Sequence, residues 1–167
     1  QFGVAIDMPA GPSELLIVAD DTAVPAFVAS DLLSQAEHGT DSQVILVSTS
    51  KDLIDAVETE IQTQLEVLPR KAIATKAIEN SKLIYVENDQ IALDLIDEYG
   101  PEHFIICAKN EDFYVNNIGN AGSVFIGNYT PESAGDYASG TNHTLPTNGY
   151  AKNYSGVNLD SFLKSMT

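Results

Sequence analysis

Five short runs of this chain consist mostly of apolar residues. Between these runs, apolar residues recur at helical spacing. The runs cover residues 14–19, 43–48, 82–86, 104–107 and 123–126. Short apolar runs bounded by polar residues are typical of strands buried on both faces of a parallel sheet. Right-handed crossovers usually join such strands, so the alternation predicts helices on both faces. We therefore expect a Rossmann-like α/β fold, incomplete relative to the full Rossmann sheet and built in three layers.

Polar residues and prolines mark the ends of the expected helices. Asp21 or Thr22 is expected to cap the first helix, and Pro25 suits its first turn. Gly39 is well suited to end this helix in the left-handed conformation. Ser50 and Asp89 are expected to cap two further helices, at 51–68 and 90–99, and similar signals predict helices at 71–80 and 111–117.

The composition changes after the fifth apolar run. Residues 127–150 are rich in Gly, Ser, Thr, Asn and Pro but also carry aromatic residues, a carboxylate and a histidine. A loop of this length is usually functional, and its mixed chemistry argues against a simple linker. A short helix is expected at 158–166. We therefore interpret 1–127 as the Rossmann-like domain and 128–167 as an active-site loop and C-terminal helical segment of the same domain.

The charge balance narrows the range of partners. The 167 residues include 24 acidic and 8 basic side chains, which gives a formal charge of −16. Such a surface repels nucleic acid and anionic membranes. Cys107 is the single cysteine, so no intramolecular disulfide can form, which favours a reducing compartment. The chain has neither an apolar run of about 18 residues nor a signal-like start, and we expect a soluble, cytoplasmic protein.

Three residues form a candidate metal site. Gln35 and His38 are three positions apart, so a helix would place them on one face near its C-terminal end. A histidine there can equally be a surface cation that interacts with the helix dipole. Asp136 is a candidate third donor, because carboxylate, imidazole and amide groups suit zinc or manganese. An aspartate after a glycine is also a common turn residue.

Glu102 and His103 fit a polar turn, and they are also adjacent candidates for general bases if a pocket surrounds them. They precede a strand, whereas ligands of open parallel sheets gather at the carboxyl ends of strands, so residues at those ends have priority. Ser13 is a candidate for orienting a polar ligand, and His143 is a weaker candidate. The chain lacks a dinucleotide-binding glycine fingerprint, a phosphate loop and a Gly-x-Ser-x-Gly motif.

Several longer motifs together resemble the histidinol dehydrogenase family. They are Asp-Met-Pro-Ala-Gly-Pro-Ser-Glu at 7–14, Asp-Leu-Leu-Ser-Gln-Ala-Glu-His-Gly at 31–39, Gly-Pro-Glu-His at 100–103 and Tyr-Thr-Pro-Glu-Ser-Ala-Gly-Asp-Tyr at 129–137, followed by Asn-His at 142–143 and Leu-Pro-Thr at 145–147. The resemblance extends over nearly the whole chain in the same order. Motifs of eight or nine residues are far more specific than any single candidate residue.

The resemblance implies a function and a set of site residues. Members of this family oxidise L-histidinol through L-histidinaldehyde to L-histidine with two NAD molecules, in the last steps of histidine biosynthesis. They are homodimers that hold one zinc ion per site. By resemblance, Gln35, His38 and Asp136 bind zinc and substrate, Glu102 and His103 are catalytic, and His103 also contacts substrate. Ser13 matches a further substrate-binding residue.

The resemblance also implies missing parts. Family members are much longer, so we expect this chain to correspond to their middle and C-terminal region. Their fourth zinc ligand, a histidine, and a substrate-binding glutamate come from the partner subunit and would lie beyond Thr167. Their NAD contacts would lie upstream. We therefore expect little activity from the isolated chain. Two alternatives remain open: a noncatalytic α/β interaction module, and a metal-assisted hydrolase in which Glu102 activates water.

Overall fold

Five parallel strands form the centre of the computed structural model, which describes residues 6, 8–9 and 11–166. The strands are β1 (Glu14–Ala19), β2 (Gln43–Ser48), β3 (Lys82–Tyr85), β4 (His103–Cys107) and β5 (Ser123–Ile126). Their order in the sheet is β3-β2-β1-β4-β5, with every neighbouring pair parallel. The α/β fold that the apolar pattern predicts is confirmed. Asp7 and Ala10 of the first motif, and Thr167, lie outside the described residues.

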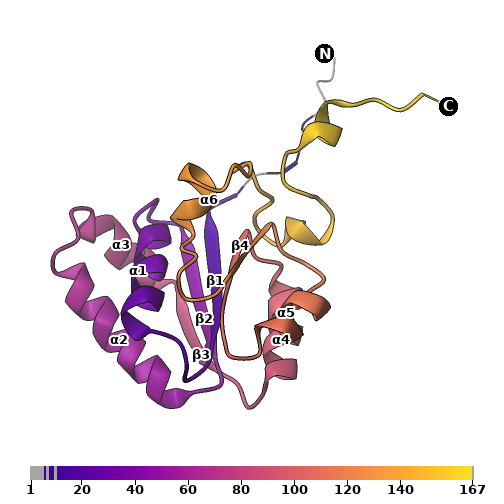
Figure 1. The fold of residues 1–167 in the computed structure, drawn as a ribbon. Helices are drawn as coiled ribbons and strands as arrows, with labels where there is room; N and C mark the ends of the chain where they lie inside the picture. The colour runs from indigo at the N-terminus through magenta and orange to yellow at the C-terminus, as the bar shows by residue number, and fades with distance from the viewer. Residues whose placement is uncertain (1–5, 7, 10, 167) are drawn as a thin grey trace.

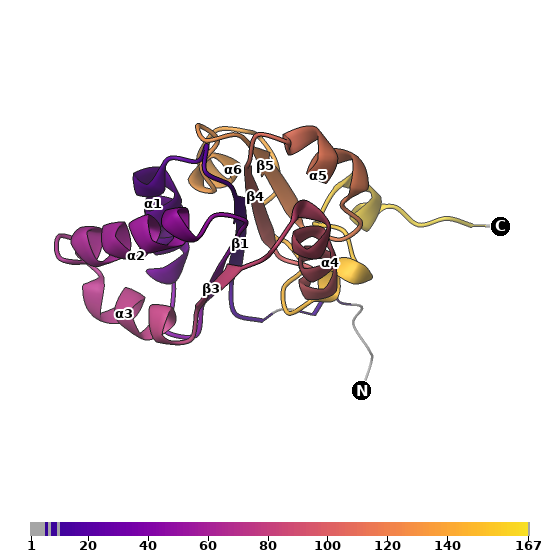
Figure 2. The same ribbon diagram turned by 90° about the horizontal axis from the view of Figure 1, so that it is seen from below.

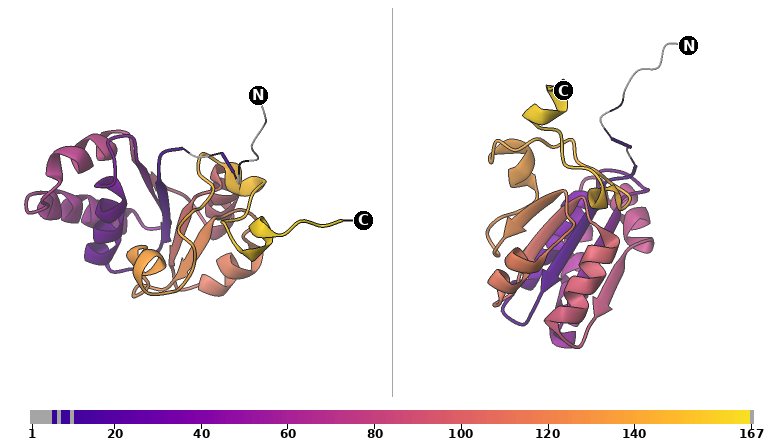
Figure 3. Two further views of the ribbon diagram at one scale, coloured as in Figure 1. Left: turned by 90° about the horizontal axis from the view of Figure 1, so that it is seen from above. Right: turned by 90° about the vertical axis from the view of Figure 1, so that its right-hand side faces the viewer.

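Helices cover both faces of the sheet, which gives three layers (Figures 1 and 2). One face carries α1 (Pro25–Ala36), α2 (Lys51–Leu65) and α3 (Lys71–Glu79), and the other carries α4 (Asp89–Tyr99) and α5 (Glu111–Asn117). The chain after β5 forms the short helix α6 (Ser133–Tyr137) and the 3-10 turns η1 (Tyr150–Lys152) and η2 (Leu159–Phe162). Beyond η2 the chain extends away from the sheet (Figure 3).

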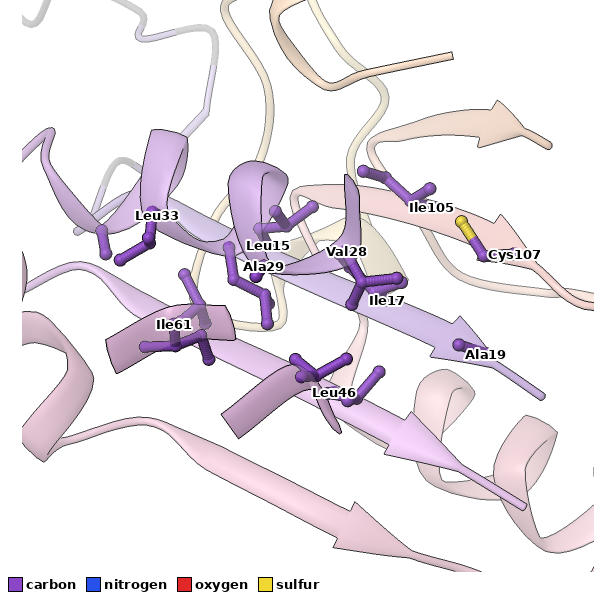
Figure 4. Packing of buried hydrophobic residues seen from close by; sticks show 14 of the residues in the cluster. Leu15, Ile17, Ala19, Val28, Ala29, Leu33, Leu46, Ile61, Ile105 and Cys107 are labelled. Carbon is purple, nitrogen blue, oxygen red and sulfur yellow. The ribbon is translucent and has the colours of Figure 1, made fainter. Parts of the chain in front are cut away.

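Two apolar cores lie on opposite faces of β1, because successive side chains of a strand point to opposite faces. Leu15 and Ile17 belong to the core under α1 and α2, part of which Figure 4 shows. Leu16 and Val18 belong to the core under α4. All four side chains are at most 1% exposed. Burial on both faces explains why this strand is an unbroken apolar run with no polar alternation.

Helix α1 begins at Pro25, as expected, but its cap and its C-terminal end differ from the prediction. Its N-cap residue is Val24, and neither Asp21 nor Thr22 caps it. The side chain of Asn128 supplies the missing acceptor, because its Oδ1 accepts a hydrogen bond from the Val24 backbone N–H at 3.1 Å. The helix ends at Ala36, and Gly39 is not in the left-handed conformation. This cap comes from a residue that is distant in the sequence.

The other helix signals are closer to the observed ends. Ser50 caps α2 by accepting a hydrogen bond from the Leu53 backbone N–H, as predicted. Helix α4 is capped by Asn88, one residue before the expected Asp89, and Gly100 ends it with a φ of 63°. The segment expected to be a helix at 158–166 forms only the 3-10 turn η2.

Candidate functional site

The sequence-predicted catalytic residues lie at the amino-terminal edge of the sheet. Glu14 begins β1, His103 begins β4, and the two strands are neighbours in the sheet. Helix α1 returns along the sheet, so its C-terminal end lies at the same edge, and α6 lies above the start of β1 (Figure 1). The carboxyl ends of the strands, which the general rule for parallel sheets favours, lie at the opposite edge. The candidate residues therefore depart from that rule.

Glu102 and His103 form a buried pair that the backbone of Glu14 holds. The Glu14 N–H donates to Glu102 Oε2 at 2.9 Å, and His103 Nδ1 lies 3.1 Å from the Glu14 carbonyl oxygen. Glu102 is 5% exposed and His103 is 7% exposed. His103 is the first residue of β4, so the pair lies at the buried start of a strand.

The contact with Glu14 fixes the tautomer of His103. A carbonyl oxygen only accepts hydrogen bonds, so Nδ1 carries the proton and Nε2 keeps a free lone pair. Burial lowers the pKa of His103, although the Glu14 carbonyl and the charge of Asp136 act in the opposite direction. The imidazole is therefore neutral near pH 7 and has a basic nitrogen available. Nε2 lies 3.7 Å from Glu132 Oε1.

Glu102 has a carboxyl group that exchanges its proton near neutral pH. Burial is the main cause that raises its pKa to about 7, and the nearby carboxylates of Glu14, Glu132 and Asp136 raise it further. The hydrogen bond from the Glu14 N–H opposes this shift. Glu14 is itself buried; its Oε1 accepts a hydrogen bond from the Asn148 backbone N–H at 2.9 Å. A carboxyl group with such a pKa suits proton transfer to and from water.

Gly122 allows the backbone to pass close to Glu102. A Cβ atom at this position would lie 2.5 Å from the Glu102 carbonyl oxygen, while the Gly122 N–H donates to the Pro101 carbonyl at 2.9 Å. We expect Gly122→Ala to lower the free energy of unfolding by about 1–3 kcal/mol, because the backbone must shift to make room. Urea denaturation measures this change.

The matched control for this substitution is Gly119→Ala. A Cβ atom there would make only ordinary contact, 3.5 Å from the Asp97 carboxylate. The control should change the urea midpoint much less than Gly122→Ala does. Equal midpoints for the two variants would show that the close approach at Gly122 does not constrain the chain.

A polar cavity of about 320 Å³ lies between the end of α1 and helix α6. Its lining includes His38 and Asp136, which are two of the predicted zinc ligands, together with Glu132 and Arg70. The fold thus brings His38 and Asp136 to one cavity although they are far apart in the sequence. Both side chains are solvent-exposed and therefore accessible to a ligand in the cavity.

Gln35 lies deeper than the other predicted zinc ligands. It is 1% exposed, and among the described residues neither atom of its side-chain amide has a hydrogen-bond partner. An unsatisfied buried amide is costly, so this side chain has the capacity to take a ligand. His38 follows the end of α1 instead of sharing a helical face with Gln35, although its N–H donates to the Gln35 carbonyl at 3.2 Å.

The three predicted zinc ligands differ in the donor atoms that they offer. Within residues 6, 8–9 and 11–166, no three His, Cys, Asp or Glu side chains come together to hold a metal ion. An amide oxygen, an imidazole and a carboxylate are nevertheless donors that zinc accepts. Gln35, His38 and Asp136 therefore fit a zinc site that needs a further ligand.

The remaining predicted site residues lie outside this cavity. Ser13 is half-buried directly before β1, and its carbonyl accepts a hydrogen bond from the Gln43 N–H at 3.2 Å. His143 is exposed in the loop after α6. Neither side chain lines the cavity next to His38.

Two buried glutamates at the site, Glu14 and Glu132, were not assigned a role from the sequence. Both lie in motifs of the family resemblance, but an isolated glutamate in a sequence is usually a surface residue. In the structure Glu14 is 7% exposed and Glu132 is 3% exposed. The position of Glu132 in the Pro-Glu-Ser motif was the only signal available, and it does not show which residue the carboxylate faces.

The comparisons with known proteins show the family of this chain. The family model described as histidinol dehydrogenase matches residues 1–167. The chain belongs to the histidinol dehydrogenase family. Histidinol dehydrogenase from Bacteroides thetaiotaomicron is 60% identical over 164 residues, which cover 98% of this chain and 38% of that protein. The Yersinia pestis histidinol dehydrogenase is 54% identical over 165 residues, covering 99% of this chain and 37% of the relative.

A solved structure supports the same assignment of the fold. The crystal structure of histidinol dehydrogenase from Elizabethkingia anophelis superposes with a TM-score of 0.95 at 58% sequence identity. It covers 98% of this chain, whereas this chain covers 38% of it. The chain thus spans well under half the length of the histidinol dehydrogenases it matches. Across the described residues, no helix has the length and apolar character needed to cross a membrane.

Proposed function

We propose that this chain forms the acid–base part of a histidinol dehydrogenase that oxidises L-histidinol through L-histidinaldehyde to L-histidine. The enzyme would act in the cytoplasm, in histidine biosynthesis. The observation that carries the proposal is the buried pair Glu102–His103, held by the backbone of Glu14 beside the cavity that His38 and Asp136 line. Membership of the histidinol dehydrogenase family supports it.

His103 would be the base of the first oxidation. Its Nδ1–H points to the Glu14 carbonyl, so Nε2 is the nitrogen that takes the proton from the substrate alcohol. Burial keeps the ring neutral and ready to accept that proton. NAD, when bound, supplies the hydride acceptor. The residues that contact it are expected outside this chain.

Glu102 would be the base of the hydration step. A water molecule must add to the aldehyde before the second oxidation, and its proton must be removed. The pKa of about 7 suits Glu102 to this role, because the carboxylate accepts a proton and returns it at physiological pH. The Glu14 N–H holds Oε2 in place at 2.9 Å.

Gln35, His38 and Asp136 are the residues of this chain that would hold zinc. When bound, zinc would supply binding and orientation for the imidazole and amino nitrogens of the substrate. The missing fourth ligand is proposed to come from the C-terminal segment of a partner subunit in a homodimer. The unpartnered amide of Gln35 and the shared cavity of His38 and Asp136 support this assignment.

We expect His38→Ala to abolish zinc binding by the full-length dimeric enzyme, because the ion loses one of its few protein ligands. Isothermal calorimetry with zinc, with and without histidinol, measures this loss. The control is Glu87→Ala, which changes an exposed residue after β3 that does not line the cavity. Unchanged zinc affinity in His38→Ala would contradict the assigned metal site.

The products formed from L-histidinol distinguish the proposed dehydrogenase from a metal-assisted hydrolase in which Glu102 activates water. The full-length enzyme should form two NADH molecules for each L-histidinol consumed, and L-histidine should be the product. A hydrolase would form no NADH, and a noncatalytic module would consume no histidinol. Spectroscopic NADH measurement combined with chromatography of the product distinguishes these outcomes.

A further inference from the structure

Glu132 is a buried carboxylate that the proposed reaction does not yet use. It precedes α6 and is 3% exposed. Its backbone N–H donates to Asp31 Oδ1 at 3.3 Å, which ties it to the middle of α1. Its Oε2 accepts a hydrogen bond from Ser34 Oγ at 3.5 Å. These contacts leave the other carboxylate oxygen, Oε1, directed to His103 Nε2 at 3.7 Å.

The two ring nitrogens of His103 thus have different partners. The Glu14 carbonyl holds Nδ1 at 3.1 Å, so Nε2 is the only nitrogen that can gain a proton. We propose that Glu132 is a positioning residue for His103, which fixes the orientation of the ring and stabilises the imidazolium formed when Nε2 takes the proton of the alcohol. This inference rests on the proposed dehydrogenase function.

The burial of Glu132 makes its effect specific to the charged form of His103. A carboxylate in a poorly solvated site gains little from a neutral imidazole but much from an imidazolium, because the local dielectric is low. The carboxylate therefore favours the protonated ring that appears during the reaction. Burial raises the pKa of Glu132, and Asp136 raises it further, while His38 and Ser34 lower it.

The proton balance of this step is simple. The O–H bond of the alcohol breaks and an N–H bond forms at His103 Nε2, while the C–H bond of the alcohol carbon breaks, its hydride passes to NAD, and the C=O bond of the aldehyde forms. Glu132 remains a carboxylate throughout and forms no covalent bond. The imidazolium is then paired with Glu132 on one side and with the Glu14 carbonyl on the other. Loss of the Nε2 proton to solvent restores the base.

Other charged groups surround the imidazole and must stay constant in a test. The groups that face it from β1, β4, α6 and the end of α1 are Glu14, Glu102, Asp136 and His38. Arg70, before α3, lines the same cavity as His38, Glu132 and Asp136. A substitution at Glu132 alone leaves all of these groups in place.

The test is Glu132→Gln in the full-length zinc-loaded enzyme. We expect kcat/KM for L-histidinol to fall about 10–100-fold and the acid limb of its pH profile to move about one unit lower. The sign follows from the charge: removing a carboxylate lowers the pKa of His103, so the base stays neutral at lower pH. Glu132→Asp should return the acid limb to its position in the parent enzyme, because aspartate keeps the negative charge.

An activity-independent measurement and a control complete the experiment. NMR titration of isotope-labelled histidine should show a lower pKa for His103 in Glu132→Gln than in the parent. The control is Glu87→Gln, which removes the same charge from an exposed position after β3. It should leave the acid limb and the NMR titration unchanged.

The outcomes separate the two proposals. A parent enzyme that forms no NADH from L-histidinol overturns the proposed function. An active parent with unshifted NMR titration and unshifted acid limb in Glu132→Gln overturns the role of Glu132, whatever the loss in rate. A shifted limb that Glu132→Asp restores supports it, because a merely structural role would lower activity without moving the limb.

Discussion

Replacement of His103 by glutamine is expected to lower kcat for L-histidinol oxidation by about 10²–10⁴-fold, which is the usual contribution of a positioned general base. Glutamine keeps a polar side chain near the Glu14 carbonyl but has no nitrogen that accepts a proton at neutral pH. Steady-state NADH formation by the full-length enzyme measures the loss.

Histidinol binding provides the control for this substitution. The calorimetric affinity for L-histidinol in the presence of zinc should change far less than kcat, because the proposed ligands Gln35, His38 and Asp136 are untouched. Glu87→Gln, at an exposed position after β3, should retain the parent rate. A kcat within threefold of the parent for His103→Gln would rule out the assigned base.

Replacement of Glu102 by glutamine is expected to stop the reaction after the first oxidation. The amide has no group that accepts the proton of the hydrating water, so oxidation of the aldehyde should slow by about 10²–10⁴-fold. In the parent, this step should accelerate as pH rises through about 7, because the carboxyl group must lose its proton to act as a base. The variant should show no such rise.

Single-turnover kinetics separate the two oxidations. The Glu102→Gln enzyme should release one NADH at a rate close to that of the parent and the second NADH far more slowly. Glu98→Gln, which changes an exposed glutamate paired with Lys152, should release both at parent rates. If the release of the first and the second NADH slowed equally, Glu102 would instead mainly position His103.

The strands and the fold class were predictable because β1, β2 and β4 are buried on both faces. Unbroken apolar runs follow from that burial. The strands β1, β2 and β5 begin and end where the sequence predicted, and β3 and β4 differ by one residue at one end. The cap of α1 was not predictable, because Asn128 acts across 104 positions of sequence. The prediction that Gly39 ends α1 in the left-handed conformation was also wrong, because the helix ends at Ala36 without a left-handed residue.

The candidate site was predictable only in part. Glu102, His103 and the zinc-binding set came from the family resemblance, since spacing alone left each of them open to a surface or turn interpretation. Local patterns do not show that Glu14 holds the pair through main-chain atoms, because that contact depends on the pairing of β1 with β4. Glu132 reaches His103 only because the chain after β5 folds back along α1.

The alignment of the catalytic pair is a property of strand register rather than of the side chain at position 14. The groups that hold Glu102 and His103 are the N–H and the C=O of Glu14, which nearly every amino acid provides. Point substitutions in β1 therefore leave these two contacts available, whereas an insertion or deletion that slides β1 by one residue against β4 removes both. The side chain at position 14 can therefore vary without loss of these two contacts, whereas the length of the first strand cannot.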